Sequence, residues 1–391
     1  MKYEIKNDVL TVYLEGRIDS SSADAVEKEI DSIRSENSFA GFVLDADNLE
    51  YISSAGLRMV LRLRKADSTT KIVNASTEVY DIFDMTGFTE IITVEKAYRR
   101  LSVEGCSIIG KGAKGTVYRL DPDTIIKVYH NPDSLPEIKN ERELARKAFV
   151  LGIPTAIPYD VVRVGNSYGS VFELLNASSF SQLIAAEPDK LDDYVAIYAE
   201  LLKKIHGTFV KLDDMPDIKE KLILKWVDTA APFLSEADAG KLSALVDAVP
   251  DTLNMLHCDY HTNNIMMQNG ESLLIDMDTL AHGHPIFELA NVYITYVGFG
   301  EDNPEIVEQF IGLPFETAKL IWEKFLPLYL GTDDEARIRE VEDKVKLLSN
   351  TRRMRHTIRR GGAETEPGRK VIETCAANIA KLLMTVDTLE F

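Results

Sequence analysis

The hydrophobic pattern of the first hundred residues alternates between strand-like runs and helix-like spacings. Short apolar runs bounded by polar turns predict strands, at residues 3–5, 9–14, 41–44, 71–73 and 91–94. Apolar residues three or four positions apart predict helices, at residues 23–33, 57–64 and 79–83. Strands that alternate with helices favour a parallel arrangement. The pattern therefore predicts an α/β domain with a small mixed sheet, largely parallel and flanked by helices.

The pattern changes near residue 102. A glycine-rich stretch with β-type flanks comes next, and helical spacing dominates from about Asp189 to the end. We therefore expect two domains, covering residues 1–102 and 103–391.

Composition narrows the classes of partner. The 391 residues carry a formal net charge of −19, which repels phosphate backbones and anionic lipids, so neither nucleic acid nor a membrane is an expected partner. Three cysteines, odd in number and far apart, argue against a disulfide framework. Because no apolar run approaches the length of a membrane span, we expect a cytoplasmic protein.

The segment from Gly110 to Val117 matches the glycine pattern G-x-G-x-x-G-x-V. In dinucleotide-binding folds a helix follows the last glycine, whereas here a strand, an Asp-Pro-Asp turn and a second strand follow. The alternative is a β-hairpin lid whose bare backbone N–H groups approach phosphate oxygens. We favour the lid and assign nucleotide binding to Gly110, Gly112, Gly115 and Val117.

Lys127 lies inside an apolar strand, where an ammonium group is costly without a partner. Its natural partners are nucleotide phosphates and a carboxylate on the helix that follows. Glu143 is our first choice for that carboxylate and Glu141 the second. The alternative is a lysine that extends into solvent from an edge strand.

Oxygen ligands cluster in the segment that begins at His257. Asp259 is followed five residues later by Asn264, and Asp276 comes after an apolar strand. Mg²⁺ prefers a few oxygen ligands and shares its coordination shell with phosphate. We therefore assign Asn264 and Asp276 to the metal, and Asp259 to orienting an attacking hydroxyl and accepting its proton.

The same stretch contains five side chains that bind transition metals: His257, Cys258, His261, His282 and His284. No pair has the H-E-x-x-H spacing of a helical zinc site, so a zinc or iron site is the less favoured reading. We interpret His257 and His261 as residues that shape the loop through hydrogen bonds. His282 and His284 are expected in a turn, and Cys258 as a small buried residue.

Together these motifs resemble the aminoglycoside phosphotransferase and choline kinase branch of the protein-kinase-like fold, over about residues 105–391. The family's H-G-D-x-H-x-x-N motif corresponds to residues 257–264, its I-D-x-D strand to 275–278 and its G-D-P-x-x-D-L-A motif to 283–290. Ile205-His206 resembles its L-H helix end, and residues 172–175 resemble its hinge.

The resemblance implies a bilobal α+β domain that uses ATP and Mg²⁺. The implied parts are an N-lobe at about 103–175, a hinge at 172–180 and a helical C-lobe at 181–391. It also implies that Glu173 and Leu175 meet the adenine, and that Asp278 and Glu288 support the site. Two residues depart from the family pattern, because Cys258 replaces a glycine and Glu288 replaces an aspartate. Neither change removes a metal ligand or the base.

Residues 47–57 resemble the phosphoacceptor loop of STAS domains of the anti-sigma-factor antagonist type, and residues 83–88 resemble a late helix end of that family. The resemblance covers about residues 1–100 and implies a regulatory or interaction domain. Ser54 stands in the phosphoacceptor place, and Ser53 stands where the family has an aspartate. The alternative role of the two serines is a helix N-cap, which is compatible with a phosphate at the helix N-terminus.

One basic island interrupts the acidic background, formed by Arg352, Arg353, Arg355, Arg359 and Arg360, with Lys370 nearby. A solvated helix face is the simplest interpretation, and a contact surface for an acidic partner is the alternative. Such a patch fits poorly with a polycationic aminoglycoside unless acidic residues such as Asp213 and Asp214 line its pocket.

The function implied is ATP-dependent transfer of the γ-phosphate to a hydroxyl of a small molecule, with the STAS domain as regulator or partner-binding module. One alternative is a signalling kinase that acts on a protein serine, including one in a STAS domain. Another is a nucleotide-sensing interaction protein without catalysis. The complete set of Lys127, Asp259, Asn264 and Asp276 argues against the last.

Overall fold

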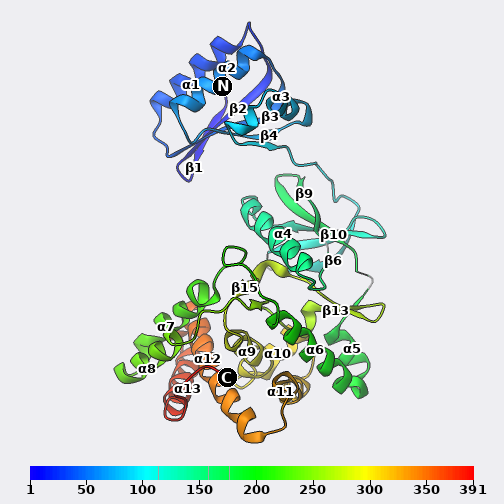
Figure 1. The fold of residues 1–391 in the computed structure, drawn as a ribbon, viewed down its shortest axis with the longest axis vertical. Helices are drawn as coiled ribbons and strands as arrows, with labels where there is room; N and C mark the ends of the chain where they lie inside the picture. Colours follow the sequence, from blue (N-terminus) through cyan, green and yellow to red (C-terminus); the bar gives the residue numbers. More distant parts are fainter. Residues whose placement is uncertain (113, 157, 176) are drawn as a thin grey trace. The chain divides into compact units, whose positions relative to one another are not determined.

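The chain folds into two compact units in the computed structural model, which describes residues 1–112, 114–156, 158–175 and 177–391 (Figure 1). The first unit comprises residues 1–102 together with 162–165, and the second comprises residues 103–161 and 166–391. Ala113 of the glycine-rich motif lies outside the described residues.

The first unit is a sheet flanked by helices. Its strands follow one another across the sheet in chain order: β1 (Tyr3–Lys6), β2 (Val9–Ile18), β3 (Gly41–Ile52), β4 (Lys71–Ala75) and β5 (Val94–Lys96). The pairing of β1 with β2 is antiparallel, and the other pairings are parallel. Helices provide the crossovers that parallel strands need: α1 (Ala23–Glu36), α2 (Ser54–Ala66) and α3 (Thr77–Met85). The predicted mixed sheet flanked by helices is confirmed.

The last strand of this unit begins later than predicted. A short 3-10 helix at Phe88–Glu90 continues into a turn, in which Ile91 N and Ile92 N both donate to Phe88 O. These bonds occupy the backbone that a strand at 91–93 would need, so of the predicted residues only Val94 belongs to β5.

The two serines at the start of α2 have different environments. Ser53 is the N-cap, and its side chain accepts a hydrogen bond from Ala55 N at 3.2 Å. Ser54 is the first residue of the helix and is exposed. The expected pair of caps is therefore a single cap at Ser53, which leaves the Ser54 hydroxyl at the surface.

The second unit begins with a five-stranded sheet in the order β6 (Ser107–Lys111), β7 (Gly115–Arg119), β8 (Thr124–Tyr129), β10 (Ser167–Glu173) and β9 (Pro158–Val164). The strands on either side of the glycine-rich turn are antiparallel, as the hairpin prediction requires. One helix, α4 (Leu135–Val150), follows β8. The Rossmann alternative is excluded because a strand, not a helix, follows the last glycine.

Helices make up most of the remainder: α5 (Phe180–Ala186), α6 (Leu191–His206), α7 (Leu224–Ala230), α8 (Glu236–Asp247), α9 (Ile286–Tyr293), α10 (Pro304–Ile311), α11 (Phe315–Leu330), α12 (Glu335–Arg359) and α13 (Glu366–Leu382). They begin earlier than Asp189 because Ser179 and Gln182 form a capping box that starts α5. Short strands lie among them: β11 (Ser178–Ser179), β12 (Met255–Leu256), β13 (Ile265–Gln268), β14 (Glu271–Leu274) and β15 (Ala281–His282).

The helical part is organised around one apolar core that includes Trp226, Tyr198, Phe287 and Phe325. The β13–β14 hairpin and the β12–β15 pair contribute residues to this core and carry the loops that contain the predicted site. None of the helices in the described part of the chain combines the length and the apolar character that a membrane crossing requires.

Candidate active site

The glycine-rich hairpin has glycines for two different reasons. A Cβ at Gly115 would lie 2.6 Å from Val128 O, so the sheet itself excludes a side chain there. Cβ atoms at Gly110 and Gly112 would meet nothing closer than 3.6 Å, and neither residue needs a positive φ. Packing therefore does not explain these two glycines, and their bare backbone leaves room for an anion to approach the N–H groups. Val117 lies opposite both Gly110 and Lys127 in the sheet.

Lys127 is held by two carboxylates. Its Nζ lies 3.1 Å from Glu141 Oε1 and 3.2 Å from Asp276 Oδ1. Glu141 is buried and also accepts a hydrogen bond from the Tyr129 hydroxyl. Burial lowers the pKa of Lys127, but the two carboxylates outweigh burial and the pKa is raised, so the side chain carries a positive charge.

The choice of Glu143 as the partner of Lys127 is wrong. Residues 141 and 143 lie about 200° apart around a helix, so only one of them faces the sheet. Glu143 faces away and pairs with Arg146 at 3.3 Å. The signal was available in the sequence, because Glu141 shares the helix face of the buried residues Ile138 and Leu144.

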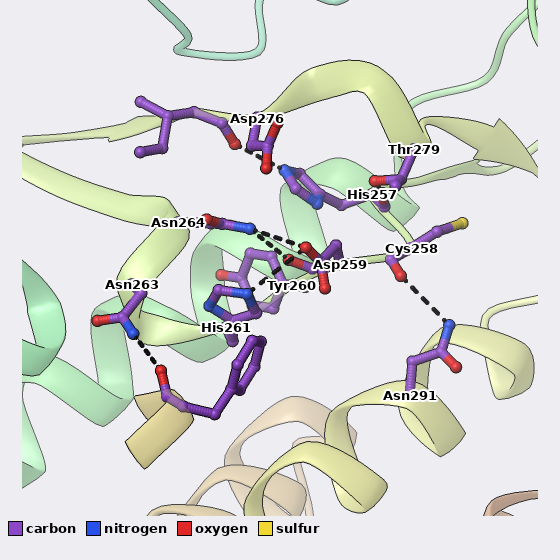
Figure 2. A network of polar contacts seen from close by, with 12 residues as sticks. His257, Cys258, Asp259, Tyr260, His261, Asn263, Asn264, Asp276, Thr279 and Asn291 are labelled. Carbon is purple, nitrogen blue, oxygen red and sulfur yellow. Dashed lines mark hydrogen bonds and ion pairs between the residues drawn. The ribbon is translucent and has the colours of Figure 1, made fainter. Parts of the chain in front are cut away.

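Asp259 and Asn264 lie side by side in the Asp259 loop (residues 257–264; Figure 2). Asn264 Nδ2 donates to Asp259 O at 2.9 Å and to its Oδ2 at 3.3 Å. His261 Nε2 lies 3.6 Å from the same carboxylate oxygen. Burial raises the pKa of Asp259, but the contact with His261 and the positive charge of Arg352 outweigh burial and hold the pKa below its ordinary value. Asp259 is therefore an ionised acceptor at neutral pH.

A buried carboxylate anchors the start of this loop. Glu288, in α9, accepts hydrogen bonds from Cys258 N at 2.6 Å and from His257 N at 2.8 Å. His206 Nε2 lies 2.9 Å from Glu288 Oε2, and the other ring nitrogen of His206 lies 2.6 Å from the Tyr329 hydroxyl. Glu288 thus has the supporting position that the sequence predicted, although it is one methylene longer than the family's aspartate.

Cys258 has a backbone conformation that glycine adopts more easily. Its φ is +66°, in the left-handed region, which explains why the related motif has glycine there. The conformation costs a residue with a Cβ about 1–2 kcal/mol. The bonds that Glu288 makes to this residue and to His257 offset that cost. Burial raises the pKa of the Cys258 thiol well above its ordinary value, so it is no nucleophile.

The polar atoms around Asn264 and Asp276 suit a hard divalent cation. Asn264 directs its amide nitrogen to Asp259, which leaves its carbonyl oxygen for a metal. Ile275 N donates to the backbone oxygen of Asn264 at 3.0 Å. Because Asp276 is the residue after Ile275, this bond brings Asp276 close to Asn264. Asp276 has a φ of +61° and a part-exposed carboxylate. An amide oxygen and a carboxylate oxygen are ligand types that Mg²⁺ prefers.

Asp278 lies near this pair but has a partner of its own. Its carboxylate forms an ion pair with Lys114, from the turn of the glycine-rich hairpin. The hairpin turn and the Asp276–Asp278 segment are therefore in direct contact.

The histidines do not converge on one point. His257 Nε2 lies 3.3 Å from Ile275 O, and His261 packs against Phe310. His282 Nδ1 lies 3.1 Å from Thr252 O, and His284 accepts from Ile286 N. In the part of the chain that the structure describes, no group of three or more His, Cys, Asp or Glu side chains is arranged to hold a metal ion. The geometry gives no support to the zinc or iron alternative.

Two site residues escaped the sequence analysis. Asn291, in α9, donates to Cys258 O at 3.4 Å, and Arg352, in α12, donates to Asn291 Oδ1 at 2.7 Å. Arg352 was included in a basic island whose simplest interpretation was a solvated face. Arg353 also departs from that interpretation, because it is buried and pairs with Glu301 at 2.8 Å. No local motif distinguishes these arginines from solvated ones.

The predicted hinge residues end the first sheet of this unit. Glu173 is the last residue of β10, and Leu174 N donates to Asp123 O at 2.7 Å. Leu175 follows outside the strand. Contact of Glu173 and Leu175 with an adenine stays a prediction.

Comparison with protein families identifies both parts of the chain. Residues 105–320 match the model of the phosphotransferase enzyme family, and residues 1–101 match the STAS domain. The chain belongs to the phosphotransferase enzyme family and carries an N-terminal STAS domain.

Individual relatives resemble one part or the other. The STAS domain is 32% identical over 90 residues to BtrV of Bordetella bronchiseptica, a protein named as an anti-sigma factor antagonist, and the match covers 22% of this chain and 77% of BtrV. Among solved structures, a choline/ethanolamine kinase family protein from Mesorhizobium loti is 16% identical, with a TM-score of 0.47, over 73% of this chain and 89% of that protein. A thermostable mutant of aminoglycoside phosphotransferase APH(4)-Ia is 13% identical, with a TM-score of 0.47, over 71% of this chain and 97% of that protein.

Replacing Glu288 tests how much its hydrogen bonds to the Asp259 loop stabilise the fold. Glu288→Gln substitutes an NH₂ group for an oxygen that accepts backbone N–H groups, so buried donors lose their acceptor. We expect the free energy of unfolding to fall by about 2–3 kcal/mol. Urea denaturation followed by tryptophan fluorescence measures this, because Trp226 and Trp322 both lie in the same unit. Glu323→Gln, at an exposed position of α11, is the matched control, and equal effects of the two changes would contradict the anchor role.

Proposed function

We propose that the protein transfers the γ-phosphoryl group of ATP, with Mg²⁺, to a hydroxyl group of a small molecule. The observation that carries this proposal is the convergence of four side chains from distant segments. Lys127 meets Asp276, and Asn264 meets Asp259. Membership in the phosphotransferase enzyme family supports the same reaction class. In this proposal residues 103–175 form the nucleotide-binding lobe, 172–180 the hinge and 181–391 the acceptor-binding lobe.

Each residue has a role that follows from its position. The bare backbone at Gly110 and Gly112 approaches the phosphates, and Lys127, oriented by Glu141, supplies positive charge to them. Mg²⁺ held by Asn264 and Asp276 neutralises charge on the phosphate oxygens when bound. Asp259 accepts the hydrogen bond of the attacking hydroxyl and then its proton. Because its pKa is lowered, Asp259 acts mainly by orienting the hydroxyl in its ionised form.

The metal assignment is tested by Asp276→Ala. We expect wild-type protein to bind ATP much more tightly with Mg²⁺ than without it, and the variant to lose most of that difference. Isothermal titration calorimetry with ATP, in the presence and absence of Mg²⁺, measures this. Asp213→Ala, at an exposed position, is the control. An unchanged Mg²⁺ dependence in Asp276→Ala means that the metal lies elsewhere.

The base assignment is tested by Asp259→Asn. The substitution preserves the shape and leaves Lys127 and Asp276 in place, so nucleotide affinity should stay the same. Turnover should fall by about 10²–10⁴-fold, the usual contribution of a general base. Single-turnover ADP release measures it, with an acceptor whose free hydroxyl the wild-type protein phosphorylates. Turnover within about threefold of wild type would exclude Asp259 from this role.

A second candidate function, a kinase that phosphorylates a STAS-domain serine, is favoured by the position of Ser54. Its hydroxyl is exposed at the first turn of α2, where free N–H groups and the helix dipole favour an added phosphate. The named activity of the relative BtrV supports a protein partner for this domain. We propose Ser54 as the phosphoacceptor through which the STAS domain is regulated.

The expected outcome is a phosphate on Ser54 after incubation with ATP and Mg²⁺, detected by mass spectrometry. Ser54→Ala should abolish it without destabilising α2, because the cap is Ser53. Ser53→Ala should keep the acceptor but lower the local stability of α2 by about 1 kcal/mol, measured by hydrogen exchange. No phosphate on Ser54 in wild-type protein, alone or with cell extract, would leave it without a regulatory role.

A further inference from the structure

Arginines form a stripe on one face of α12 that begins beside the Asp259 loop. Arg352, Arg355 and Arg359 are three and four residues apart, so they share a helix face. Among the described residues, none of the three forms an ion pair, and the buried Nε of Arg355 has no hydrogen-bond partner. Arg353, between them, is on another face and pairs with Glu301 and Asp302. The buried Arg353 therefore has carboxylate partners, whereas the three arginines of the stripe form no ion pairs with other described residues.

Arg352 connects the stripe to the loop that contains the base. It donates to Asn291, which in turn donates to Cys258 O, the residue before Asp259. Its guanidinium also lies over the ring of Trp226, with 5.6 Å between the guanidinium carbon and the ring centroid. These contacts fix one end of the stripe next to Asp259.

A second cation, Lys221, acts electrostatically on the same loop. Burial raises the pKa of the Cys258 thiol, whereas the positive charges of Lys221 and Arg352 act in the opposite direction. The Lys221 side chain is exposed and has no hydrogen bond or ion pair with other described residues. Burial lowers the pKa of Arg355, and the positive charge of Arg359 lowers it further. The second effect reflects repulsion between the two arginines.

The proposed metal ligand Asn264 and the partner of Arg352 lie on different sides of Asp259. Figure 2 shows Asn264 on one side of Asp259 and Asn291, the partner of Arg352, on the other. Ile275 N donates to the backbone O of Asn264, so Asp276, which pairs with Lys127, follows directly beside Asn264. An acceptor hydroxyl that approaches Asp259 from the Asn291 side would meet the arginine stripe.

We infer that the acceptor is a small hydroxyl compound that carries a carboxylate or phosphate group, bound by Arg352 and Arg355. Guanidinium groups bind such anions through paired hydrogen bonds, which would also satisfy the free Nε of Arg355. A polycationic aminoglycoside is disfavoured by the same charges. Asp214 does not offset the charges of these arginines, because it pairs with Lys147 at 3.2 Å.

The inference rests on the proposed function and specifies its acceptor. In the step, a bond forms between the acceptor oxygen and the γ-phosphorus while the bond from that phosphorus to the β-phosphate oxygen breaks. The hydroxyl proton passes to Asp259, and ADP leaves with the electron pair of the broken bond. The anionic group of the acceptor stays on the arginines and takes no part in bond making.

The test compares four hydroxyl compounds that differ in charge: glycerate, glycerol 3-phosphate, glycerol and choline. Each is titrated calorimetrically into the full chain with Mg²⁺ and a non-hydrolysable ATP analogue, and ADP release is measured with ATP. We expect at least one of the two anions to bind about tenfold or more tightly than glycerol and choline. Comparing the two anions distinguishes a carboxylate from a phosphate as the recognised group.

Variants of the stripe decide whether the arginines cause the preference. Arg355→Gln should weaken anion binding by about 10- to 100-fold without changing binding of the ATP analogue. Arg355→Glu should reverse the preference toward choline. Arg339→Gln removes an arginine from the other end of α12, where it pairs with Glu335, and should change neither ligand.

The outcomes separate this inference from the proposed function. Failure of wild-type protein to bind Mg·ATP would overturn the proposed function and the acceptor with it. Normal nucleotide binding, with glycerol or choline bound as well as the anions or with none of the four bound, would overturn the anionic acceptor alone. Anion binding that survives Arg355→Gln and Arg355→Glu would also overturn it. Phosphorylation of an acidic serine peptide, with none of the four compounds accepted, would replace the small molecule by a protein.

Discussion

The buried carboxylate of Glu288 determines the geometry of the candidate site. It accepts the backbone N–H groups of His257 and Cys258, and it lies against the ring of His206. These bonds hold Cys258 in a left-handed conformation that a residue with a Cβ otherwise avoids. Because Asp259 is the next residue, its direction follows from that constraint. The proposed base is therefore positioned through the backbone, by a carboxylate on another helix.

Charge is divided between the two sides of Asp259. On one side Lys127 pairs with Glu141 and Asp276. A bound phosphate could replace Asp276 as a partner of Lys127, and a bound cation could replace Lys127 as a partner of Asp276. On the other side Arg352 donates to the neutral Asn291, and Arg355 forms no ion pair with other described residues. The chain carries a net charge of −19, so this concentration of unmatched cations runs against its overall composition. A bound anionic acceptor would resolve the imbalance.

The sequence predicts those parts of the site that depend on short-range constraints. Lys127, Asp259, Asn264 and Asp276 were identified because each lies in a motif whose spacing is dictated by a loop or strand. The choice between Glu141 and Glu143 depends on helix phase, because only Glu141 shares the face of the buried residues Ile138 and Leu144. The sequence does not show which of Ser53 and Ser54 is the N-cap, because serine is favoured at that position and the two serines are adjacent.

Residues that act through tertiary contacts cannot be predicted from short-range patterns in the sequence. Arg352 belongs to a run of arginines that looks like a solvated face, and only the packing of α12 beside α9 shows that it meets Asn291. Arg353, its neighbour, is buried for a similar reason. A long-range contact of this kind leaves no periodic signal in one sequence. The resemblance to a family located the supporting carboxylate, but not the hydrogen bonds that it makes.

Hydrogen exchange at individual backbone amides of the full chain tests the central claim most directly. If Glu288 anchors the Asp259 loop, the amides of His257 and Cys258 should exchange as slowly as those in the core of α9, through unfolding of the whole helical region. The amide of Asp302, in a turn, gives the rate of an exposed loop in the same unit. Exchange of His257 and Cys258 at that loop rate would contradict the account.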